Sequence, residues 1–473
     1  MFKRTKIVAT LGPSTDSPEV LDGLLEAGVD VVRLNFSHGS EADRERRVRE
    51  IREAAARAGR DVGILGDLQG PKIRVERFSD GPVALREGAR FALDASLAAD
   101  AGDAHAVGVA YKSLPQDVAP GDVLLLNDGA ITLEVQAVAG TRIDCLVKVG
   151  GMLSDNKGIN RQGGGLSAGA LTGKDREDIR HAATLDLDFL AVSFPRSAAD
   201  IEEARALLTE AGGRALMVAK IERAEAVERI EEIARASEVV MVARGDLGVE
   251  IGFAEVPGVQ KNIIRVARSL NRIIITATQM MESMIHEPIP TRAEVSDVAN
   301  AVIDGTDAVM LSGETAVGRY PVKAVQAMAG ACVSAEKQRA TSISHHRMDQ
   351  VFQRTDEAIA MATMYIANHM NVKAIVALTE SGSTALWMSR IRSGIPIYAF
   401  SRNEGTRRRV VLYRGVYPVP FDVTLTGDDG FGLVCEALKS RGIVAEGDRI
   451  LLTEGREAGV AGGTNTLRVL MVG

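Results

Sequence analysis

The feature that most limits the fold of this chain is a series of eight short apolar runs, most of which end in polar residues. The runs cover residues 6–12, 31–37, 62–68, 189–194, 216–222, 239–246, 272–278 and 308–315. Between most of them lie amphipathic helical patterns, as in 259–270, where Ile263, Val266, Ala267 and Leu270 follow the spacing i, i+3, i+4, i+7. Near-continuous apolar strands that alternate with such helices indicate a parallel sheet, and eight units fit a closed (β/α)8 TIM barrel.

The regular spacing of the runs breaks once, between the third and the fourth. The intervening segment contains short alternating strands separated by turn residues, which is typical of a small β domain. We therefore predict an inserted β-barrel domain at residues 70–165 and a catalytic barrel formed by residues 1–69 and 166–340. Loops after barrel strands open on the C-terminal face of a TIM barrel, so this insertion is placed to act as a lid over a site there.

A second α/β series follows a charged stretch near residue 340. Its strand-like runs lie at residues 373–379, 395–401, 415–421, 448–454 and 466–473. The pattern predicts an open, doubly wound α/β domain over residues 341–473.

Composition excludes several classes of protein. Apolar residues make up 46% and charged residues 25% of the chain, as in ordinary soluble α/β proteins. The formal charge of −7 argues against a nucleic-acid partner but permits a local cationic pocket for a small anion. The 3 cysteines lie far apart without a CxxC pair, which indicates a reducing compartment and no zinc site. There is no signal-like N-terminus and no membrane-spanning run, so we expect a cytoplasmic protein without a membrane partner.

Polar residues gather at the C-terminal ends of the barrel runs, where a TIM barrel builds its active site. They are Arg33, Asn35, Ser37, His38, Asp67, Lys220, Glu222, Arg244, Asp246, Thr278, Ser312 and Glu314. Taken singly, each has a structural explanation: an ion pair at a sheet rim, a glycine turn, a helix cap or a capping turn. The same chemistry at six strand ends favours a functional site.

The types of charge at these positions suggest what the site binds. Glu222 and Asp246 follow adjacent strands and together suit a hard divalent cation such as Mg2+. Arg33, Lys220 and Arg74 would surround that cation with positive charge. Such a mixture stabilises a phosphoryl group in transfer and an enolate-like oxygen.

Eight segments of the chain resemble the sequence blocks of the pyruvate kinase family, in the family's order and spacing. They read VVRLNFSHG, GDLQGPKIR, KGIN, LMVAKIERAEAV, VARGDLGVE, TATQMMESM, PTRAEVSDVANAV and MLSGETAVGRYP. The resemblance runs from about residue 4 to the C-terminus and includes the lid and the terminal α/β domain. It is closest to a compact bacterial form with neither an N-terminal extension nor an appended phosphotransfer domain.

The resemblance implies Mg2+-dependent phosphoryl transfer from phosphoenolpyruvate to ADP, which gives pyruvate and ATP in the final ATP-forming step of glycolysis. Glu222 and Asp246 would hold Mg2+ or Mn2+, while Lys220 and Arg33 contact the phosphoryl group. The amides of Gly245 and Asp246, with Thr278, would orient the substrate carboxylate. Thr278, Ser312 and Glu314 lie where the family relays a proton to the enol.

The resemblance also implies sites for the nucleotide, an effector and further subunits. Asn35, His38, Arg74 and Lys157 match positions that face ADP or ATP. Ser381, Gly382, Ser383 and Thr384 match an allosteric site for a sugar phosphate or AMP in a regulatory C-terminal domain; the alternative is ordinary capping of a helix. Residues 288–300, with Arg292, match the inter-subunit segment of a homotetramer.

One position departs from the family members that require K+. Those members carry a glutamate where this chain has Lys72. Asn35, Ser37, Asp67 and the Leu68 carbonyl would form the cage for the monovalent ion, and a lysine ammonium nearby would supply the same charge. We therefore predict that Mg2+ is required and K+ is not. If Lys72 instead points into solvent, the cage would still bind K+.

Two other functions fit parts of the pattern. A metal-assisted aldolase or an enolase-type barrel shares the lysine and the metal but needs no nucleotide, so formation of ATP from ADP separates the two. A metabolite-binding scaffold without activity has no reason to retain Lys220, Glu222, Asp246 and Thr278 together. Fold alone decides neither case.

Overall fold

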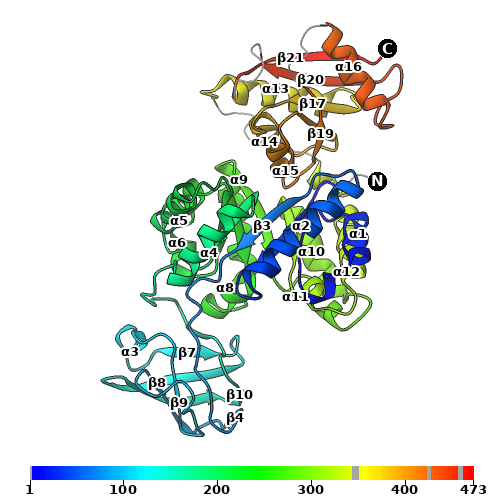
Figure 1. Ribbon diagram of the computed structural model, residues 1–473. Coiled ribbons are helices and arrows are strands. Elements are labelled where there is room, and N and C mark those ends of the chain that lie inside the picture. Colours follow the sequence, from blue (N-terminus) through cyan, green and yellow to red (C-terminus); the bar gives the residue numbers. More distant parts are fainter. Residues whose placement is uncertain (1–2, 343–350, 423–427, 456–461) are drawn as a thin grey trace.

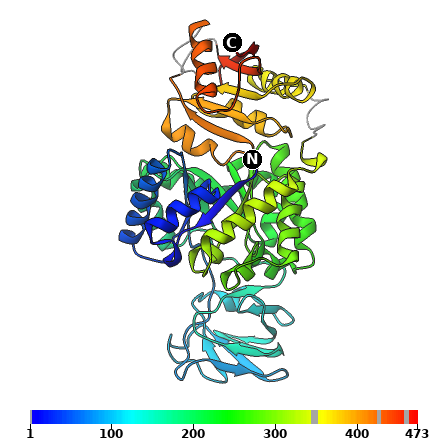
Figure 2. The same cartoon turned by 90° about the vertical axis from the view of Figure 1, so that its right-hand side faces the viewer.

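The computed structural model describes residues 3–342, 351–422, 428–455 and 462–473 of the chain. Two views at right angles show three bodies in a row (Figures 1 and 2). A β-rich lid, coloured cyan, lies at one end, a ring of strands and helices lies in the middle, and an α/β domain coloured yellow to red lies at the other end.

The central body is a closed barrel of eight parallel strands, which confirms the predicted fold class. Its strands are β1 (Lys6–Thr10), β2 (Val31–Asn35), β3 (Gly63–Asp67), β12 (Phe189–Val192), β13 (Leu216–Ile221), β14 (Val239–Ala243), β15 (Ile273–Ala277) and β16 (Ala308–Leu311). They follow one another around the barrel in the order β1, β16, β15, β14, β13, β12, β3, β2. The strands are mostly apolar because both faces are covered, one by the barrel interior and the other by helices, and their charged residues include Arg33, Asp67 and Lys220.

Helices surround the strands, and side-chain caps fix where several of them start. The helices are α1 (Pro18–Ala27), α2 (Glu41–Arg57), α4 (Gly173–Thr184), α5 (Ala198–Glu210), α6 (Ala224–Glu228), α7 (Ile230–Ala236), α8 (Arg244–Ile251), α9 (Val256–Ser269), α10 (Arg292–Asp304), α11 (Gly313–Ala316) and α12 (Pro321–Ala335), with 3-10 turns η1 (Pro13–Thr15), η2 (Glu282–Ile285) and η3 (Arg339–Thr341). Ser40, Thr172 and Thr291 accept a hydrogen bond from the third amide of α2, α4 and α10. No helix in the described ranges is both long and apolar enough to cross a membrane.

The lid is inserted after β3. Its elements are β4 (Val83–Leu85), β5 (Arg90–Asp94), β6 (Ala106–Gly108), α3 (Leu114–Asp117), β7 (Val123–Leu126), β8 (Ile131–Ala139), β9 (Arg142–Val149), β10 (Gly151–Leu153) and β11 (Ile159–Arg161). Six strands form one sheet in the order β11, β7, β8, β9, β5, β6, and β10 pairs with β4. The lid has a hydrophobic core of its own, which includes Phe91, Leu133 and Ile143. The boundaries at residues 70, 165 and 340 stay predictions.

The C-terminal domain is an open sheet flanked by helices. Its elements are α13 (Thr355–His369), β17 (Ala374–Leu378), α14 (Ser383–Ser389), β18 (Ile397–Ser401), α15 (Glu404–Val410), β19 (Val416–Pro420), α16 (Asp428–Lys439), β20 (Arg449–Gly455) and β21 (Thr464–Met471). The strand order is β19, β18, β17, β20, β21, and β21 alone among these strands runs antiparallel, against β20. All five strand-like runs in this part of the sequence are strands.

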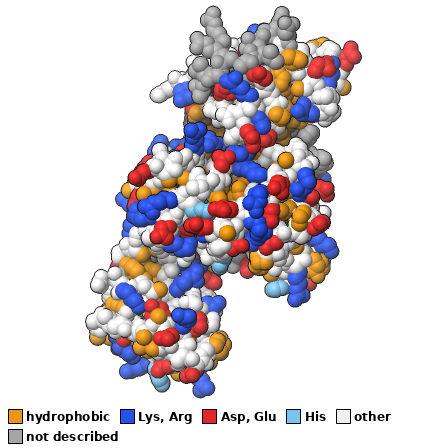
Figure 3. Space-filling view, in the orientation of Figure 1, with side chains coloured by type: hydrophobic (Ala, Val, Ile, Leu, Met, Phe, Trp, Pro, Cys, Tyr) orange, Lys and Arg blue, Asp and Glu red, His pale blue; other side chains and the backbone are white. Residues whose placement is uncertain are grey.

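The barrel and the C-terminal domain meet at the N-terminal end of the barrel strands, and charged side chains gather along this junction (Figure 3). The Asp307 carboxylate, 2% exposed, binds both terminal nitrogens of Arg390, which is 1% exposed. Arg414 donates to the carbonyls of Val302 and Thr306, both at 3.0 Å. Burial and the neighbouring arginines lower the pKa of Arg268 to about 9. Burying positive charge at this junction is therefore energetically unfavourable, and the Asp307 carboxylate compensates for this charge at the centre.

Candidate active site

Lys220 lies at the centre of the polar side chains at the C-terminal end of the barrel. Its Nζ lies 2.9 Å from Glu222 Oε1 and 3.2 Å from Asp67 Oδ1, and it donates to Ser193 Oγ at 2.6 Å. Lys220 and Glu222 are two residues apart at the end of β13, so their side chains point the same way. Burial alone would lower the pKa of the Lys220 ammonium, but Asp67 and Glu222 hold that pKa above its usual value.

Arg33 joins the cluster from β2. Its Nε lies 2.6 Å from Asp67 Oδ2, and its Nη1 donates to Thr10 Oγ1 at 3.1 Å. Burial would raise the pKa of the Asp67 carboxyl, but Lys220 and Arg33 hold that pKa below its usual value. Asp67 therefore stays ionised and fixes two cations side by side, which is a suitable arrangement for binding a phosphoryl group.

Glu222 and Asp246 provide carboxylates from adjacent strands. Glu222 Oε2 accepts the Phe194 amide at 2.9 Å. Burial raises the pKa of the Glu222 carboxyl, Lys220 opposes this rise and Asp246 adds to it, so the two carboxylates repel each other. No group of three or more His, Cys, Asp or Glu in the described ranges is arranged to hold a metal. Two carboxylates that need a shared cation still fit Mg2+, which completes its coordination with water and substrate oxygens.

Lys72 lies between the lid and the barrel rather than in solvent. Its Nζ lies 3.3 Å from Asp246 Oδ1 and 3.8 Å from Asp128 Oδ1, and its side chain is 27% exposed. In the described part of the chain, no hydrogen bond or ion pair links this ammonium to the residues expected to form the monovalent-ion cage. Of those residues, Leu68 accepts from Ser193 Oγ at 2.8 Å, and the Asn35 side chain accepts the Ser37 amide at 3.1 Å.

Thr278 has an unusual backbone conformation at the end of β15. Its φ of 68° lies in the left-handed region, which is rare for a β-branched residue. The hydroxyl accepts the Gly245 amide at 2.8 Å and donates to the Ala277 carbonyl at 2.6 Å. The structure thus brings together Thr278 and Gly245, two residues to which the resemblance gives one substrate-binding role, and backbone strain of this kind is common at functional sites.

Ser312 and Glu314 follow β16 and contact the loop after β15. Glu314, 2% exposed, accepts the Ser312 amide at 2.7 Å and the Met281 amide at 3.1 Å. The Ser312 hydroxyl oxygen is buried and has no hydrogen-bond partner within the described ranges. A buried hydroxyl with unused hydrogen-bonding capacity beside a buried carboxylate is chemically suited to a proton relay.

The predicted nucleotide residues come from two regions. Asn35 ends β2, and His38 is exposed just beyond it. Arg74 and Lys157 lie on two facing chain segments at the base of the lid, where Arg74 bridges to Gly158 and the Val75 amide donates to the Lys157 carbonyl at 2.9 Å. The backbone at the base of the lid thus places Arg74 and Lys157 on neighbouring chain segments.

Two strand-end residues differ from expectation. Arg244 directs its guanidinium to Asp297 at 2.7 Å and to the Thr278 carbonyl at 2.7 Å, so it braces the loop after β15 instead of facing Lys220. Ser193, which sequence reasoning missed, contacts Lys220, Asp67 and the Leu68 carbonyl. The sequence signal for Ser193 was its position at the end of a barrel run, but a single serine at such a position is also typical of a turn.

The remaining predicted segments lie away from this cluster. Ser381 Oγ donates to Ser383 Oγ at 3.3 Å, and the Gly382 amide, at φ 84°, donates to Thr379 Oγ1 at 2.9 Å. Thr384 is buried, and its hydroxyl is hydrogen-bonded to that of Thr464 at 2.6 Å. In segment 288–300, Arg292 is exposed, and so are the apolar side chains of Ile289, at 72%, and Val295, at 39%.

Comparisons with known proteins agree with this geometry. Residues 2–325 match the model of the pyruvate kinase barrel domain, and residues 357–470 match that of the pyruvate kinase alpha/beta domain. Pyruvate kinase II of Salmonella typhimurium is 55% identical over 100% of this chain and 99% of its own length. A pyruvate kinase of Haemophilus influenzae is 54% identical with the same coverage. The crystal structure of a pyruvate kinase from Cryptosporidium parvum superposes with a TM-score of 0.93 at 32% identity and covers 100% of this chain and 96% of that one.

Identity at this level over the whole length decides between the enzyme functions that the strand-end cluster alone allows. An aldolase or an enolase-type barrel would not match both the barrel and the alpha/beta domain models of one family of kinases. Enzymes of this family use phosphoenolpyruvate and ADP and generally need Mg2+ and K+. The chain belongs to the pyruvate kinase family (EC 2.7.1.40), which transfers the phosphoryl group of phosphoenolpyruvate to ADP and forms pyruvate and ATP at the end of glycolysis.

Proposed function

We propose that the family reaction takes place at the strand-end cluster, with Lys220 and Arg33 as the groups that bind the transferred phosphoryl. The observation that carries this proposal is the burial of Lys220 between Asp67 and Glu222, beside an arginine held by the same Asp67. Charge on a loosely bonded phosphoryl group is spread over its oxygens, so two fixed cations stabilise the transition state more than the ground state.

Glu222 and Asp246 hold the divalent cation, Mg2+ or Mn2+. When bound, this ion neutralises charge on the substrate oxygens and orients them. The Gly245 and Asp246 amides, with Thr278, position the substrate carboxylate at the start of α8. The 2.8 Å hydrogen bond between Gly245 and Thr278 supports this grouping.

Protonation of the enolate needs a path to solvent. Thr278 delivers the proton, and Ser312 and Glu314 connect it to solvent, because a threonine hydroxyl is too weak an acid to act alone. The buried, unpartnered Ser312 hydroxyl within the described ranges supports this assignment. Asn35, His38, Arg74 and Lys157 bind the nucleotide, with Arg74 and Lys157 brought in by the lid.

A coupled assay tests the reaction as a whole. Purified protein is supplied with phosphoenolpyruvate, and pyruvate and ATP are measured with and without Mg2+ and with and without ADP. Both products are expected in equal amounts only when Mg2+ and ADP are both present. Pyruvate released at the same rate without ADP would contradict the kinase assignment.

We further propose that Lys72 replaces K+ in this enzyme. Its ammonium lies 3.3 Å from Asp246, so it places a positive charge beside one of the two proposed metal carboxylates and opposes binding of another cation nearby. We predict that added KCl, at constant ionic strength in tetramethylammonium buffer, changes the rate by less than about twofold. An enzyme that needs K+ lacks an essential charge in this buffer, so stimulation by about tenfold or more would contradict the proposal.

The variant Lys72→Glu sharpens this prediction. In K+-free buffer it is expected to lose about tenfold or more of the activity, because a carboxylate replaces a cation beside Asp246. Added KCl should restore part of that loss. Lys148→Glu, on an exposed lid lysine, is the matched control. A Lys72→Glu enzyme that ignores K+ would show that Lys72 does not stand in for the ion.

We also propose three properties of the whole enzyme. Residues 381–384 bind a sugar phosphate or AMP as an effector, and Ser381→Asp is expected to abolish the response of the phosphoenolpyruvate saturation curve to it.

The exposed Ile289 and Val295 support association into a homotetramer through 288–300, and a monomeric mass in light scattering would contradict it. The three unpaired cysteines fit a cytoplasmic location.

A further inference from the structure

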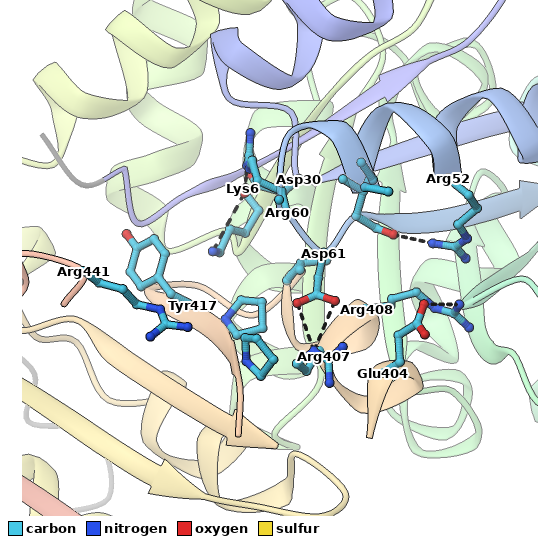
Figure 4. A pocket seen from close by; sticks show the side chains of 17 residues that line it. Lys6, Asp30, Arg52, Arg60, Asp61, Glu404, Arg407, Arg408, Tyr417 and Arg441 are labelled. Atoms are coloured by element: carbon cyan, nitrogen blue, oxygen red, sulfur yellow. Dashed lines mark hydrogen bonds and ion pairs between the residues drawn. The ribbon is translucent and has the colours of Figure 1, made fainter. Parts of the chain in front are cut away.

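The two domains attached to the barrel are held to it in different ways. Ion pairs cross the junction with the C-terminal domain, where Arg407 of α15 lies 3.1 Å from Asp61 beside a cavity of about 520 Å3 (Figure 4). The lid instead joins the barrel through two chain segments, an outgoing arm at residues 68–72 and a return arm at residues 162–168. The position of the lid over the active site therefore depends on how these two arms are held.

The outgoing arm is closely packed against the barrel. Gly70 has a φ of 66°, and its amide donates to Asp175 Oδ1 at 3.0 Å. A Cβ atom at this glycine would lie 2.8 Å from Ser193 Cβ and 3.0 Å from the Phe194 ring. Ser193 and Phe194 also contact the strand-end cluster, so the outgoing arm cannot shift without disturbing the active site.

The return arm has a backbone suited to a hinge. Gly163, Gly164 and Gly165 follow one another with φ values of 82°, 79° and 89°, in the left-handed region that glycine adopts without steric cost. Consecutive residues without a Cβ atom can change their backbone angles with little resistance. The return arm therefore keeps one position only if side chains hold it there.

Side chains of the barrel hold the return arm through charge-assisted hydrogen bonds. The carboxylate of Glu225, on α6, accepts the Gly165 amide. Arg223 and Arg196 donate to the carbonyls of the next two residues of the arm, at 3.2 Å and 2.9 Å. Hydrogen bonds to ionised groups are about twice as strong as neutral ones, so these three side chains can fix the arm.

Glu225 makes the closest contact with the hinge glycines. A Cβ atom at Gly164 would lie 2.8 Å from both of its carboxylate oxygens, and Oε2 is buried without a hydrogen-bond partner in the described ranges. Glycine at position 164 thus allows the backbone to approach the carboxylate. Glu225 lies just after Glu222 on the segment that leaves β13, so one short stretch carries a proposed metal ligand and the contact with the hinge.

We propose that Glu225 is a positioning residue that holds the return arm of the lid and so keeps Lys157 within reach of the nucleotide. The inference rests on the nucleotide-binding role proposed above for Lys157. This lysine lies on the lid shortly before the return arm, so rotation about the hinge glycines would move it relative to the barrel. Phosphoenolpyruvate would be affected far less, because the groups proposed to bind it lie on the barrel.

Steady-state kinetics of Glu225→Ala test this role. The KM for ADP is expected to rise about tenfold or more, because a charge-assisted hydrogen bond that holds the lid is lost. The KM for phosphoenolpyruvate should stay within about twofold of wild type. Glu225→Gln keeps an acceptor oxygen and should give a KM for ADP between these two enzymes.

Glu228→Ala is the matched control for this variant. It removes an exposed carboxylate from the same helix and should change neither KM. An unchanged KM for ADP in Glu225→Ala, or an equal rise in both KM values, would overturn the proposal.

Two alanine variants test the same contact from the lid side. Gly164→Ala places a methyl group against the Glu225 carboxylate and should raise the KM for ADP as Glu225→Ala does. Gly163→Ala imposes the same left-handed strain, but its Cβ atom meets no other atom within 4 Å, so the KM for ADP should stay within about twofold.

The double variant Gly164→Ala/Glu225→Ala completes this comparison. It should have the KM for ADP of Glu225→Ala alone, because the methyl group no longer has a carboxylate to displace. Equal effects of Gly163→Ala and Gly164→Ala would assign the change to backbone strain and overturn the role of Glu225.

Hydrogen exchange of the enzyme without substrates separates this proposal from the nucleotide assignment. Backbone amides of residues 162–168 should exchange faster in Glu225→Ala than in wild type or in Glu228→Ala. Lys157→Ala tests the nucleotide role alone, because it leaves the contacts of the arm intact. If Lys157→Ala does not change the KM for ADP, the nucleotide assignment is wrong, and faster exchange in Glu225→Ala would still support the contact with the arm. Unchanged exchange in Glu225→Ala would overturn that contact.

Discussion

Replacing Lys220 by methionine should lower kcat by several orders of magnitude, about 10³-fold or more, because it removes a charge that stabilises the transferred phosphoryl group in the transition state. The KM for phosphoenolpyruvate should change far less, since in the proposed site Arg33 and the divalent cation would also hold the substrate. Steady-state kinetics at saturating Mg2+ measure both values. Turnover within about tenfold of the unmodified enzyme would contradict the role of Lys220.

The control for this variant must separate chemistry from folding. Lys220 also compensates for the buried carboxylates of Asp67 and Glu222, so its loss should cost stability as well as activity. Thermal unfolding and titration with Mn2+ show whether the variant is folded and binds metal. Lys261→Met, on the outer face of α9, is the matched control and should retain full activity.

Replacing Asp307 by asparagine should lower the free energy of unfolding by about 3 to 5 kcal/mol, because it leaves Arg390 buried without its ionic partner. Arg268 and Arg414 lie close enough to add repulsion, and burial with the neighbouring arginines already lowers the pKa of Arg414 to about 10. Chemical denaturation measures the effect, and if the two domains unfold separately, the transition that includes the junction should shift.

Asp186→Asn provides the matched control at the same junction. Asp186 pairs with Arg408, but its side chain is 80% exposed, so solvent screens the interaction and the loss should stay below about 1 kcal/mol. Equal destabilisation by Asp307→Asn and Asp186→Asn would mean that burial of the Arg390 pair does not matter.

The sequence predicted the barrel well because its signal is local and repeated. Each strand is an apolar run buried on both faces, and each helix carries its own periodic pattern. Short lid strands such as β6 and β11 gave no such signal, since three residues cannot show a period. Topology then placed the strand-end residues together, because the C-terminal ends of all eight strands lie on one face.

Side-chain directions in the site were not predictable in the same way. Arg244 and Lys220 both lie at the C-terminal ends of barrel strands, yet Arg244 turns to Asp297 on α10 while Lys220 turns to Asp67 and Glu222. The contact of Lys72 with Asp246 depends on how the lid leaves the barrel, which no local pattern encodes. The left-handed backbone of Thr278 is also invisible in sequence, because threonine disfavours it.

The insertion of the lid between β3 and β12 has a consequence for how the chain folds. These strands are neighbours in the barrel, with Leu65 opposite Phe189, so the barrel closes only when the two ends of the lid meet. Closing a flexible loop on the order of 100 residues costs about 4 kcal/mol in chain entropy. A lid that folds first on its own core avoids most of this cost, because the Ile159 amide donates to the Ile73 carbonyl at 2.8 Å and holds the two ends side by side. The folded lid would then also hold the two ends of the insertion together, so that β3 and β12 can pair and close the barrel.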